Sequence, residues 1–245
     1  EWIVDVIKYN RRAWDVRVAE HDQWTLPVAP EVIEKARRGD WSVVLTPIKA
    51  VPAPWLGDVR GKDVLGVASG GGQQMPVFAA AGAHTTSFDN SPAQLAQDAA
   101  VAERDALEIT TVLGDMADLS AFGDATFDLV FHPVSNCFVP DPLPVWREAF
   151  RVLRPGGRLL VGFCQPLLFM FDDTALHDGE VVVRHKLPYA DADRLDDEQV
   201  LRYMDKWEPL VFGHTLAAQI GGQLNRIGRG HSFSLDWQMI NHCSG

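Results

Sequence analysis

Five short apolar runs alternate with helical patterns between Lys62 and Gly162, and this alternation constrains the fold more than any other feature. The runs are Asp63–Ala68, His84–Phe88, Ile109–Leu113, Phe127–His132 and Arg158–Gly162. A helix between two strands returns the chain to the same end of the sheet, so successive strands run parallel. The pattern therefore predicts an α/β fold built on a mainly parallel, doubly wound sheet.

The helices of this block carry their own start and stop patterns. Ser91–Gln94 is a capping box with proline at the first helical position, and apolar residues recur at helical spacing after it. A second helix is indicated by an apolar stripe made of Leu143, Trp146, Phe150 and Leu153. We expect this helix to end at Pro155–Gly157, because proline cannot continue it.

Residues 1–60 precede this block, and we interpret them as a helical extension that could form a lid. The apolar face of the first helix comprises Ile3, Ile7, Trp14 and Val18. The second helix is expected from Pro30 to Gly39, with Glu early and Lys or Arg late, as the helix dipole prefers. Residues 46–61, TPIKAVPAPWLGDVRG, are too rich in proline for a helix and are interpreted as a linker.

Tryptophan is concentrated in the extension, which contains Trp2, Trp14, Trp24, Trp41 and Trp55. These large side chains could simply attach the extension to the core, since an aromatic ring buries much apolar area. Alternatively, some of them could line a lid over a binding site. The sequence leaves both interpretations open.

The pattern is looser after Gly162, and residues 165–212 are interpreted as an insertion in a domain that spans residues 61–245. We expect an inserted strand at Val181–Leu187, and helices at Asp197–Lys206 and His214–Leu224. Residues 231–240, HSFSLDWQMI, alternate apolar and polar side chains as a half-buried strand does. Only this one clear strand follows Leu224, so the C-terminal edge of the sheet is expected to be incomplete or altered.

The composition of the chain argues against several classes of binding partner. A formal net charge of −11 argues against a broad grip on nucleic acid, because phosphate binding needs clustered Lys and Arg. No apolar run reaches the length of a membrane span. Cys137, Cys164 and Cys243 have no paired spacing, which favours a reducing cytoplasm and argues against a cysteine-based zinc site. We therefore expect a cytoplasmic protein with a small-molecule partner, without nucleic acid or membrane; the oligomeric state is not predicted.

Three consecutive glycines, Gly70–Gly72, stand between the first predicted strand and the helix after it. Open α/β sheets bind ligands at this turn, and glycine lets the backbone approach a ligand closely. A purely structural turn is one interpretation. A dinucleotide loop would need the spacing G-x-G-x-x-G, which fails because Gln73 or Met75 stands where the last glycine is required.

Five motifs occur in order along residues 62–162, and they read VLGVASGGG, FDNS, LGDMADL, FDLVFHP and RVLRPGGRLLVGF. Together they resemble the core of the class I S-adenosylmethionine-dependent methyltransferases. The loop ASGGGQQ with HPVSNCF looks like a bacterial branch of that superfamily. The resemblance implies a Rossmann-like fold and S-adenosylmethionine as the cofactor. The family usually has an acid where Gly66 stands and a glycine where Ala68 stands, so another acceptor could hold the cofactor's ammonium.

The resemblance also implies the residues that bind the cofactor, which are Ala68, Ser69, Gly70, Gln73, Gln74, Asp89, Asn90, Asp115, Met116 and His132. The carboxylate of Asp89 can accept both ribose hydroxyls. A role as helix N-cap is the alternative, although Ser91 already fits that position. Asp115 would meet the adenine amino group and the Met116 N–H a ring nitrogen, unless Asp115 only forms a turn.

Backbone groups of Ala68, Ser69 and Gly70 would face the methionine portion of the cofactor. Gln73 and Gln74 are neutral and long enough to reach its carboxylate, although Gln74 could equally be an exposed helix residue.

His132 and Asn136 are the candidate catalytic residues, since the segment HPVSN leaves the fourth strand beside the expected sulfonium. His132 could be a general base, because an imidazole titrates near neutrality, or it could offer a backbone contact with a packed ring. Asn136 could orient the acceptor. No metal ion is expected, because a metal site needs several converging ligands and Asp141 is the only nearby carboxylate in sequence.

The leading hypothesis is methyl transfer to an oxygen, nitrogen or carbon atom of a small molecule by in-line displacement. Alignment supplies much of the acceleration in such a reaction, so no catalytic signature is required. A non-catalytic S-adenosylmethionine-binding protein is an alternative, given Gly66 and Ala68. A nucleotide-cofactor oxidoreductase is a further alternative, which the glycine spacing disfavours. The identity of the acceptor is not readable from the sequence.

Overall fold

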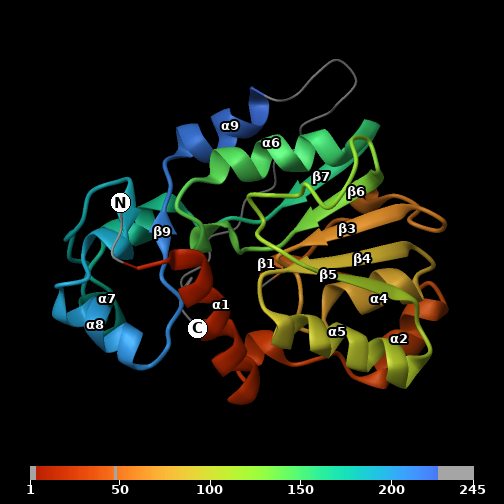
Figure 1. Cartoon of the computed structure of the whole chain (residues 1–245), viewed down its shortest axis with the longest axis horizontal. Coiled ribbons are helices and arrows are strands. Elements are labelled where there is room, and N and C mark those ends of the chain that lie inside the picture. Colours follow the sequence, from red (N-terminus) through yellow and green to blue (C-terminus); the bar gives the residue numbers. More distant parts are fainter. Residues whose placement is uncertain (1–3, 47–48, 226–245) are drawn as a thin grey trace.

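The computed structural model describes residues 4–46 and 49–225 of the 245-residue chain. At its centre lies a sheet in the order β5-β4-β3-β6-β7, in which every pairing is parallel (Figure 1). The strands are β3 (Asp63–Val67), β4 (His84–Asp89), β5 (Ile109–Leu113), β6 (Phe127–His132) and β7 (Leu153–Val161). The five strands predicted between Lys62 and Gly162 and the α/β fold class are confirmed.

The strand order creates a switch point between β3 and β6. From β3 the chain moves outward through β4 to β5, and it then returns to place β6 on the other side of β3. The loops that follow β3 and β6 therefore diverge at the carboxyl edge of the sheet. This crevice is where open α/β sheets bind ligands, and the glycine loop lies at it.

The main helices between the strands are α4 (Gln74–Ala80), α5 (Pro92–Asp105) and α6 (Pro142–Val152). The Ser91 hydroxyl caps α5 by accepting from the Gln94 N–H at 3.1 Å, as the capping box predicts. The prediction that the last helix continues to Pro155–Gly157 is wrong, since Leu153 already belongs to β7. Arg154 precedes a proline, and a residue in that position avoids the helical region.

Alternate residues of the central strands β3 and β6 enter hydrophobic clusters on opposite faces of the sheet, as the period of a strand requires. On one face, Leu65 and Val130 belong to the same cluster as Trp146 of α6. On the other face, Val64 belongs to a cluster with Phe78 of α4. Both faces are covered, as a parallel sheet needs.

The extension contributes to the second cluster through α2 (Pro30–Arg37), β1 (Val44–Thr46), α3 (Ala53–Leu56) and the turns beside them. The exposed strand β2 (Lys49–Ala50) pairs with β1. The start of α2 at Pro30 is confirmed. The interpretation of residues 46–61 as a linker without helix is wrong, because α3 forms within them. Its prolines stand at the start of the helix, where the missing N–H costs nothing. Trp41 and Trp55 pack against this cluster, so these two rings attach the extension to the core.

Helix α1 (Val6–Ala19) buries a different face from the predicted one. Its buried residues are Val6, Asn10, Ala13 and Arg17, two of them polar, whereas Ile7 is 39% exposed. Ile3 lies outside the described residues. Polar residues can be buried here because Asn10 and Arg17 have hydrogen-bond partners in distant parts of the chain.

The remaining short elements are η1 (Gln23–Thr25), η2 (Asn136–Phe138), η3 (Pro166–Met170), α7 (Asp173–His177), β8 (Tyr189–Ala190), η4 (Asp191–Asp193), α8 (Glu198–Asp205), β9 (Phe212–Gly213), η5 (Ala217–Gly221) and α9 (Gly222–Leu224). The helix expected at Asp197–Lys206 is confirmed, and η5 with α9 occupies the second predicted helix. The strand expected at Val181–Leu187 is wrong. Within the described residues, Val183 makes one isolated bridge to Phe171, and Val181 is 71% exposed, so no neighbouring strand pairs with this run.

Residues 231–240, where a further strand is expected, lie outside the described part of the chain. None of the helices in the described ranges combines the length and apolar character that a membrane crossing demands.

Candidate functional site

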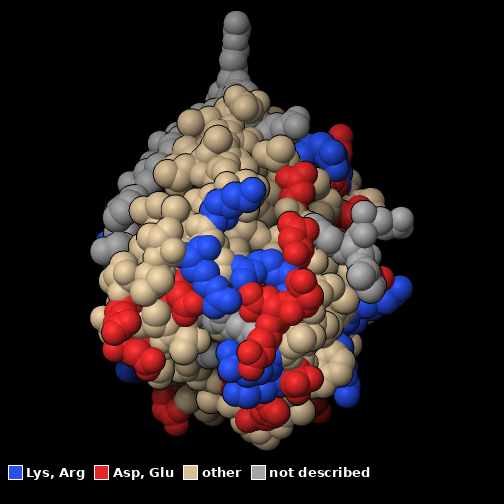
Figure 2. All heavy atoms as spheres, turned by 90° about the vertical axis from the view of Figure 1, so that its left-hand side faces the viewer, with Lys and Arg blue, Asp and Glu red and all other residues tan. Residues whose placement is uncertain are grey.

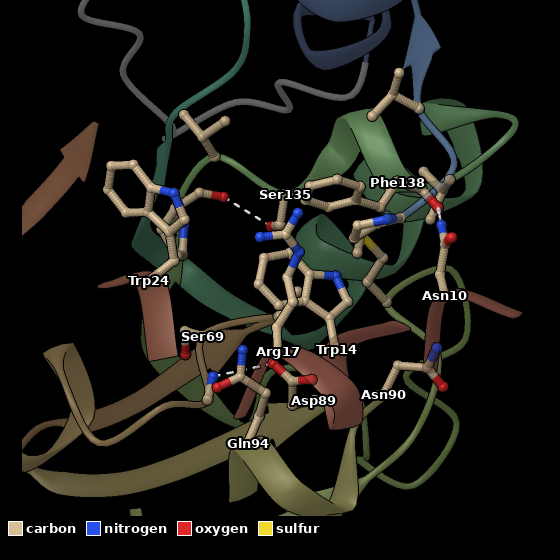
Figure 3. A pocket seen from close by; sticks show the side chains of 18 of the residues that line it. Asn10, Trp14, Arg17, Trp24, Ser69, Asp89, Asn90, Gln94, Ser135 and Phe138 are labelled. Atoms are coloured by element: carbon tan, nitrogen blue, oxygen red, sulfur yellow. Dashed lines mark hydrogen bonds between the residues drawn. The ribbon is translucent and has the colours of Figure 1, made fainter. Parts of the chain in front are cut away.

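A pocket of about 680 Å³ opens at the carboxyl ends of β3, β4, β5 and β6. Its floor is formed by the glycine loop and the loops after β4 and β5. Its opposite wall comes from α1 and from residues 203–211. In Figure 3, Ser69, Asp89 and Gln94 lie at the floor, while Trp14, Arg17 and Phe138 lie across from them. The pocket therefore lies between segments at opposite ends of the sequence.

The glycine loop is pressed against α5, which explains its composition. A Cβ atom on Gly70 would lie 2.7 Å from the Cβ of Gln94, too close for any side chain. Gly71 and Gly72 have φ angles of +107° and +72°, which favour glycine. Each of the three N–H groups donates to a residue of the following segment: to Asp89 at 3.0 Å, the carbonyl of Gln94 at 2.9 Å and Asp98 at 3.0 Å.

Asp89 ends β4 and borders the pocket. Its Oδ2 accepts from the Gly70 N–H at 3.0 Å, and its Oδ1 accepts from the Ser91 N–H at 2.9 Å. Because a carboxylate oxygen can accept two hydrogen bonds, each oxygen retains one acceptor position. Burial raises the pKa of Asp89 to about 6.

Asp98 holds the loop from behind, and the sequence analysis missed it. Its carboxylate is fully buried, and it accepts from the Gly72 N–H at 3.0 Å and from the Ser87 hydroxyl at 2.7 Å. Burial raises the pKa of Asp98 to about 7. An acidic residue on the apolar side of a helix, between Leu95 and Val101, is the signal that could have identified it.

Gly66, where the family usually has an acid, leaves no room for a side chain. A Cβ there would lie 2.0 Å from the Ser69 hydroxyl oxygen and 2.3 Å from the Met75 sulfur. The Ser69 hydroxyl is buried and has no hydrogen-bond partner in the part of the chain that is described. Ala68 adopts a φ of +49° and donates its N–H to the Phe88 carbonyl at 2.7 Å, so it occupies the left-handed position without glycine.

Gln73 and Gln74 border the pocket, but their side chains bind the extension. Gln73 Nε2 donates to the Leu26 carbonyl at 3.1 Å, and Gln74 Oε1 accepts from the Val44 N–H at 2.9 Å. The two glutamines therefore fasten the extension to the start of α4.

Asn90, Asp115 and Met116 also line the pocket. Asn90 Nδ2 donates to the Ile7 carbonyl of α1 at 2.9 Å, and its Oδ1 accepts from Arg11 at 3.1 Å. Asp115 Oδ1 accepts from the Ala117 N–H at 3.1 Å, which is the turn-forming role considered as its alternative.

The structure does not bring the side chain of His132 or Asn136 into the pocket. The His132 ring is 1% exposed, packs edge-on against Trp146, and donates from Nδ1 to the Val67 carbonyl at 2.9 Å. Burial lowers the pKa of His132 to about 4, which does not suit a general base near neutrality. Asn136 is fully buried, and its Nδ2 donates to Gln219 Oε1 at 2.8 Å. The prediction that His132 and Asn136 are catalytic is therefore corrected. The His132 ring packs in the core, and Asn136 forms a buried amide pair with Gln219.

Helix α1 forms the opposite wall through side chains that bind distant segments. Asn10 Nδ2 donates to the carbonyls of Phe138 and Leu210 at 3.0 Å, and its Oδ1 accepts from the Leu210 N–H at 2.8 Å. Arg17 forms ion pairs with Asp22 and Glu208. These contacts connect α1 to the segment that follows α8.

Two of the tryptophans in the extension, Trp14 and Trp24, line the pocket. Trp14 packs edge-on against Phe138, with ring centroids 5.3 Å apart. Trp14 and Trp24 thus border the pocket, whereas Trp41 and Trp55 pack against the core, and Trp2 lies outside the described residues. A lid role for the extension stays a prediction.

Residues 65–161 match a protein family described as a methyltransferase domain. The uncharacterized methyltransferase YbaJ of Bacillus subtilis is 47% identical over 220 residues, which span 90% of this chain and 86% of YbaJ. The ubiquinone/menaquinone biosynthesis C-methyltransferase UbiE of Roseobacter denitrificans is 37% identical over 111 residues, which span 44% of each protein. An S-adenosylmethionine-dependent methyltransferase structure from Mesorhizobium loti matches with a TM-score of 0.52 at 17% identity, over 71% of this chain and 76% of that one, and shares the fold.

The likeness to the Bacillus protein extends over most of the chain, and the motif resemblance agrees with it. The sheet order and the position of the glycine loop are those that the resemblance implies. An oxidoreductase with a dinucleotide loop fits neither the glycine spacing nor these relatives. The protein is an enzyme with S-adenosylmethionine as its cofactor, and the chain belongs to the class I S-adenosylmethionine-dependent methyltransferases.

Proposed function

We propose that the enzyme transfers a methyl group to an oxygen, nitrogen or carbon atom of a small molecule that binds between the glycine loop and α1. The observation that carries the proposal is the shared pocket of about 680 Å³, which is bordered by the loops after β3–β5 and by α1 with residues 203–211. Ligand pockets in proteins have roughly this size, about 300–1,000 Å³. The volume suits a cofactor together with a small acceptor.

The groups at the floor of the pocket fit the cofactor. Asp89 has a free acceptor position on each oxygen for the ribose hydroxyls. Ala68 and Gly70 present backbone to the methionine portion. The buried Ser69 hydroxyl lacks a partner among the residues that the structure describes, so it is our candidate for the acceptor that replaces the missing acid at Gly66. When bound, S-adenosylmethionine supplies a methyl group activated by a sulfonium.

The other residues predicted to bind the cofactor stay in the proposal, some of them with a different role. Asp115 and Met116 border the pocket where adenine is expected. Gln73, Gln74 and Asn90 border the cofactor and also hold the extension over it through their hydrogen bonds. His132 would contribute only the backbone at the end of β6.

We further propose that residues 1–60 act as an extension that closes over a methyltransferase domain of residues 61–245. Trp14, Phe138 and Val139 give the acceptor side an apolar wall, and the insertion at residues 165–212 completes it through Asp191 and Tyr203. A closed wall excludes water and holds two reactants in line, which is the main requirement of a displacement at carbon. Ser135 is the polar side chain of the HPVSN segment that borders the pocket.

A small-molecule acceptor agrees with the charge of the protein. The formal net charge is −11, and on the face shown in Figure 2 the Lys and Arg side chains are interspersed with Asp and Glu. A nucleic-acid interface would need a coherent basic surface. Independence from metal ions and a cytoplasmic location stay predictions.

The proposal is tested by calorimetric titration with S-adenosylmethionine, S-adenosylhomocysteine and NAD, followed by a turnover screen over metabolite pools. We expect binding of the first two ligands, no binding of NAD, and formation of S-adenosylhomocysteine with a fraction of small metabolites. EDTA should leave turnover unchanged. Turnover only with DNA, RNA or protein would contradict the proposal, and loss of activity with EDTA that Mg²⁺ restores would overturn its metal-free chemistry.

A further inference from the structure

Gln94 occupies a place in the pocket that the cofactor motifs do not explain. It lies in the first turn of α5, borders the pocket and is only 6% exposed. Its backbone already has partners, since its N–H donates to Ser91 and its carbonyl accepts from Gly71. The side-chain Oε1, in contrast, is buried and has no hydrogen-bond partner among the described residues. A buried acceptor without a donor is unfavourable, so this atom calls for a ligand.

The position of Gln94 indicates which part of a ligand it would meet. A Cβ on Gly70 would lie 2.7 Å from the Cβ of Gln94 and 3.1 Å from Asp89 Oδ2. A Cβ on the next residue, Gly71, would lie 2.8 Å from Gln94 Oε1, so the two side chains border adjacent glycines of the loop. Figure 3 shows Gln94 and Asp89 side by side at the floor of the pocket. A carboxamide next to a carboxylate offers both a donor and acceptors to one small region of a ligand.

We propose that Gln94 binds the ribose diol of the cofactor together with Asp89. In this role Gln94 makes the site prefer a cofactor with both ribose hydroxyls over one that lacks a hydroxyl. A hydroxyl group both donates and accepts, so it can donate to Asp89 or to Gln94 Oε1 while its own oxygen accepts from the Gln94 amide. Asp89 alone supplies only acceptors, because both oxygens of an ionised carboxylate lack a proton. The inference rests on the proposed function, in which Asp89 is the ribose ligand.

The test measures the dissociation constants of S-adenosylhomocysteine and of its 2′-deoxy and 3′-deoxy analogues by calorimetry. Gln94→Met, which keeps the length of the side chain but removes the amide, should weaken binding of the parent compound about five- to tenfold. For the analogue that lacks the hydroxyl bound by Gln94, the same substitution should change the constant by less than about twofold, because the interaction is already absent.

Gln97→Met is the matched control, since Gln97 lies on the same helix but does not border the pocket. Gln94→Asn keeps a polar amide at the site and withdraws it by one methylene. It should weaken binding of the parent compound and of the deoxy analogues in the same way as Gln94→Met, although its side chain packs differently. An equal loss of affinity for the parent and both deoxy analogues would overturn the proposal, as would no loss at all. Failure of the unmodified protein to bind S-adenosylhomocysteine would instead contradict the proposed function.

Discussion

The two walls of the pocket are held by contacts that differ in sequence separation. We call residues 63–132 the cofactor wall, and α1 with residues 203–211 the cap. In the cofactor wall, Gly70 bonds Asp89 across 19 positions and Gly72 bonds Asp98 across 26. In the cap, Arg17 pairs with Glu208 across 191 positions and Asn10 bonds Leu210 across 200.

Because the contacts of the two walls differ in sequence separation, substitutions in the two walls should have different consequences. A contact within one βαβ unit forms with the local fold, so its loss should alter the loop and the ligand bound to it. A contact between the two ends of the chain closes a very long loop, so its loss should loosen the cap and leave the cofactor wall intact. The following predictions break one wall at a time.

The largest effect is expected for Asn10→Ala in the cap. The substitution leaves the Phe138 carbonyl and both backbone groups of Leu210 without this partner. Each group left unpaired costs roughly 1–3 kcal/mol, so the free energy of unfolding should fall by at least about 3 kcal/mol. Urea denaturation measures this change. The control is Arg12→Ala on the same helix, where an exposed cation–π contact to Trp207 is worth about 0.5 kcal/mol. A large loss of S-adenosylhomocysteine affinity in a folded Asn10 variant would contradict the separation of the walls.

Asp89→Ala should act on the other wall. We expect the affinity for S-adenosylhomocysteine to fall by roughly 1.5–3 kcal/mol, the range for hydrogen bonds to a charged group. Calorimetric titration gives the value, and Asp118→Ala, an exposed carboxylate outside the pocket, is the control. An unchanged dissociation constant in a folded protein would rule out Asp89 as the ribose ligand.

Gly66→Ala tests whether the cofactor wall has room for the side chain that the family usually carries. The new Cβ would overlap Ser69 and Met75, and overpacking of this kind costs about 1–3 kcal/mol of stability. The double variant Gly66→Ala with Ser69→Ala should recover part of that loss in thermal unfolding. Gly221→Ala, where a Cβ meets nothing within 4 Å, should be neutral or stabilising. A tolerated Gly66→Ala would show that the loop can move away.

The last prediction is a pH dependence that arises behind the glycine loop, and its effect per pH unit is the smallest of the four. The folded protein keeps a proton on Asp98 up to about pH 7, whereas an unfolded chain releases it near 3.8. The folded state therefore binds more protons between these values, and stability should fall as the pH rises, by about 1 kcal/mol per unit between pH 5 and pH 7. Asp98→Asn should flatten the slope in urea denaturation, apart from the part due to Asp89, whose pKa is raised to about 6. A slope that the substitution leaves unchanged would assign the titration to other groups.

The corrections to the sequence-based site have one origin, which is that burial was not predictable. His132 and Gln94 are both polar residues next to a cofactor motif. Their local sequences do not indicate which side chain is packed in the core and which borders the pocket. The His132 ring is packed against Trp146, while Gln94 borders the pocket, because of how α6 and α5 lie on opposite faces of the sheet. The side chains of Gln73 and Gln74 likewise found partners in residues 26 and 44, which no local pattern connects to them.

The sequence by itself determined the strands, the capped helix α5, the position of the glycine loop and Asp89 at the end of β4. Each of these depends on side-chain period, on turn chemistry or on spacing within a single βαβ unit, so neighbours along the chain suffice to specify it. Only the tertiary structure decided that α1 buries Asn10 and Arg17 instead of its apolar stripe, and that Trp14 faces the pocket while Trp41 packs in the core. The reason is physical: burying a polar side chain is costly unless hydrogen-bond partners meet it, and the partners of Asn10 and Arg17 include residues 208 and 210, far along the chain.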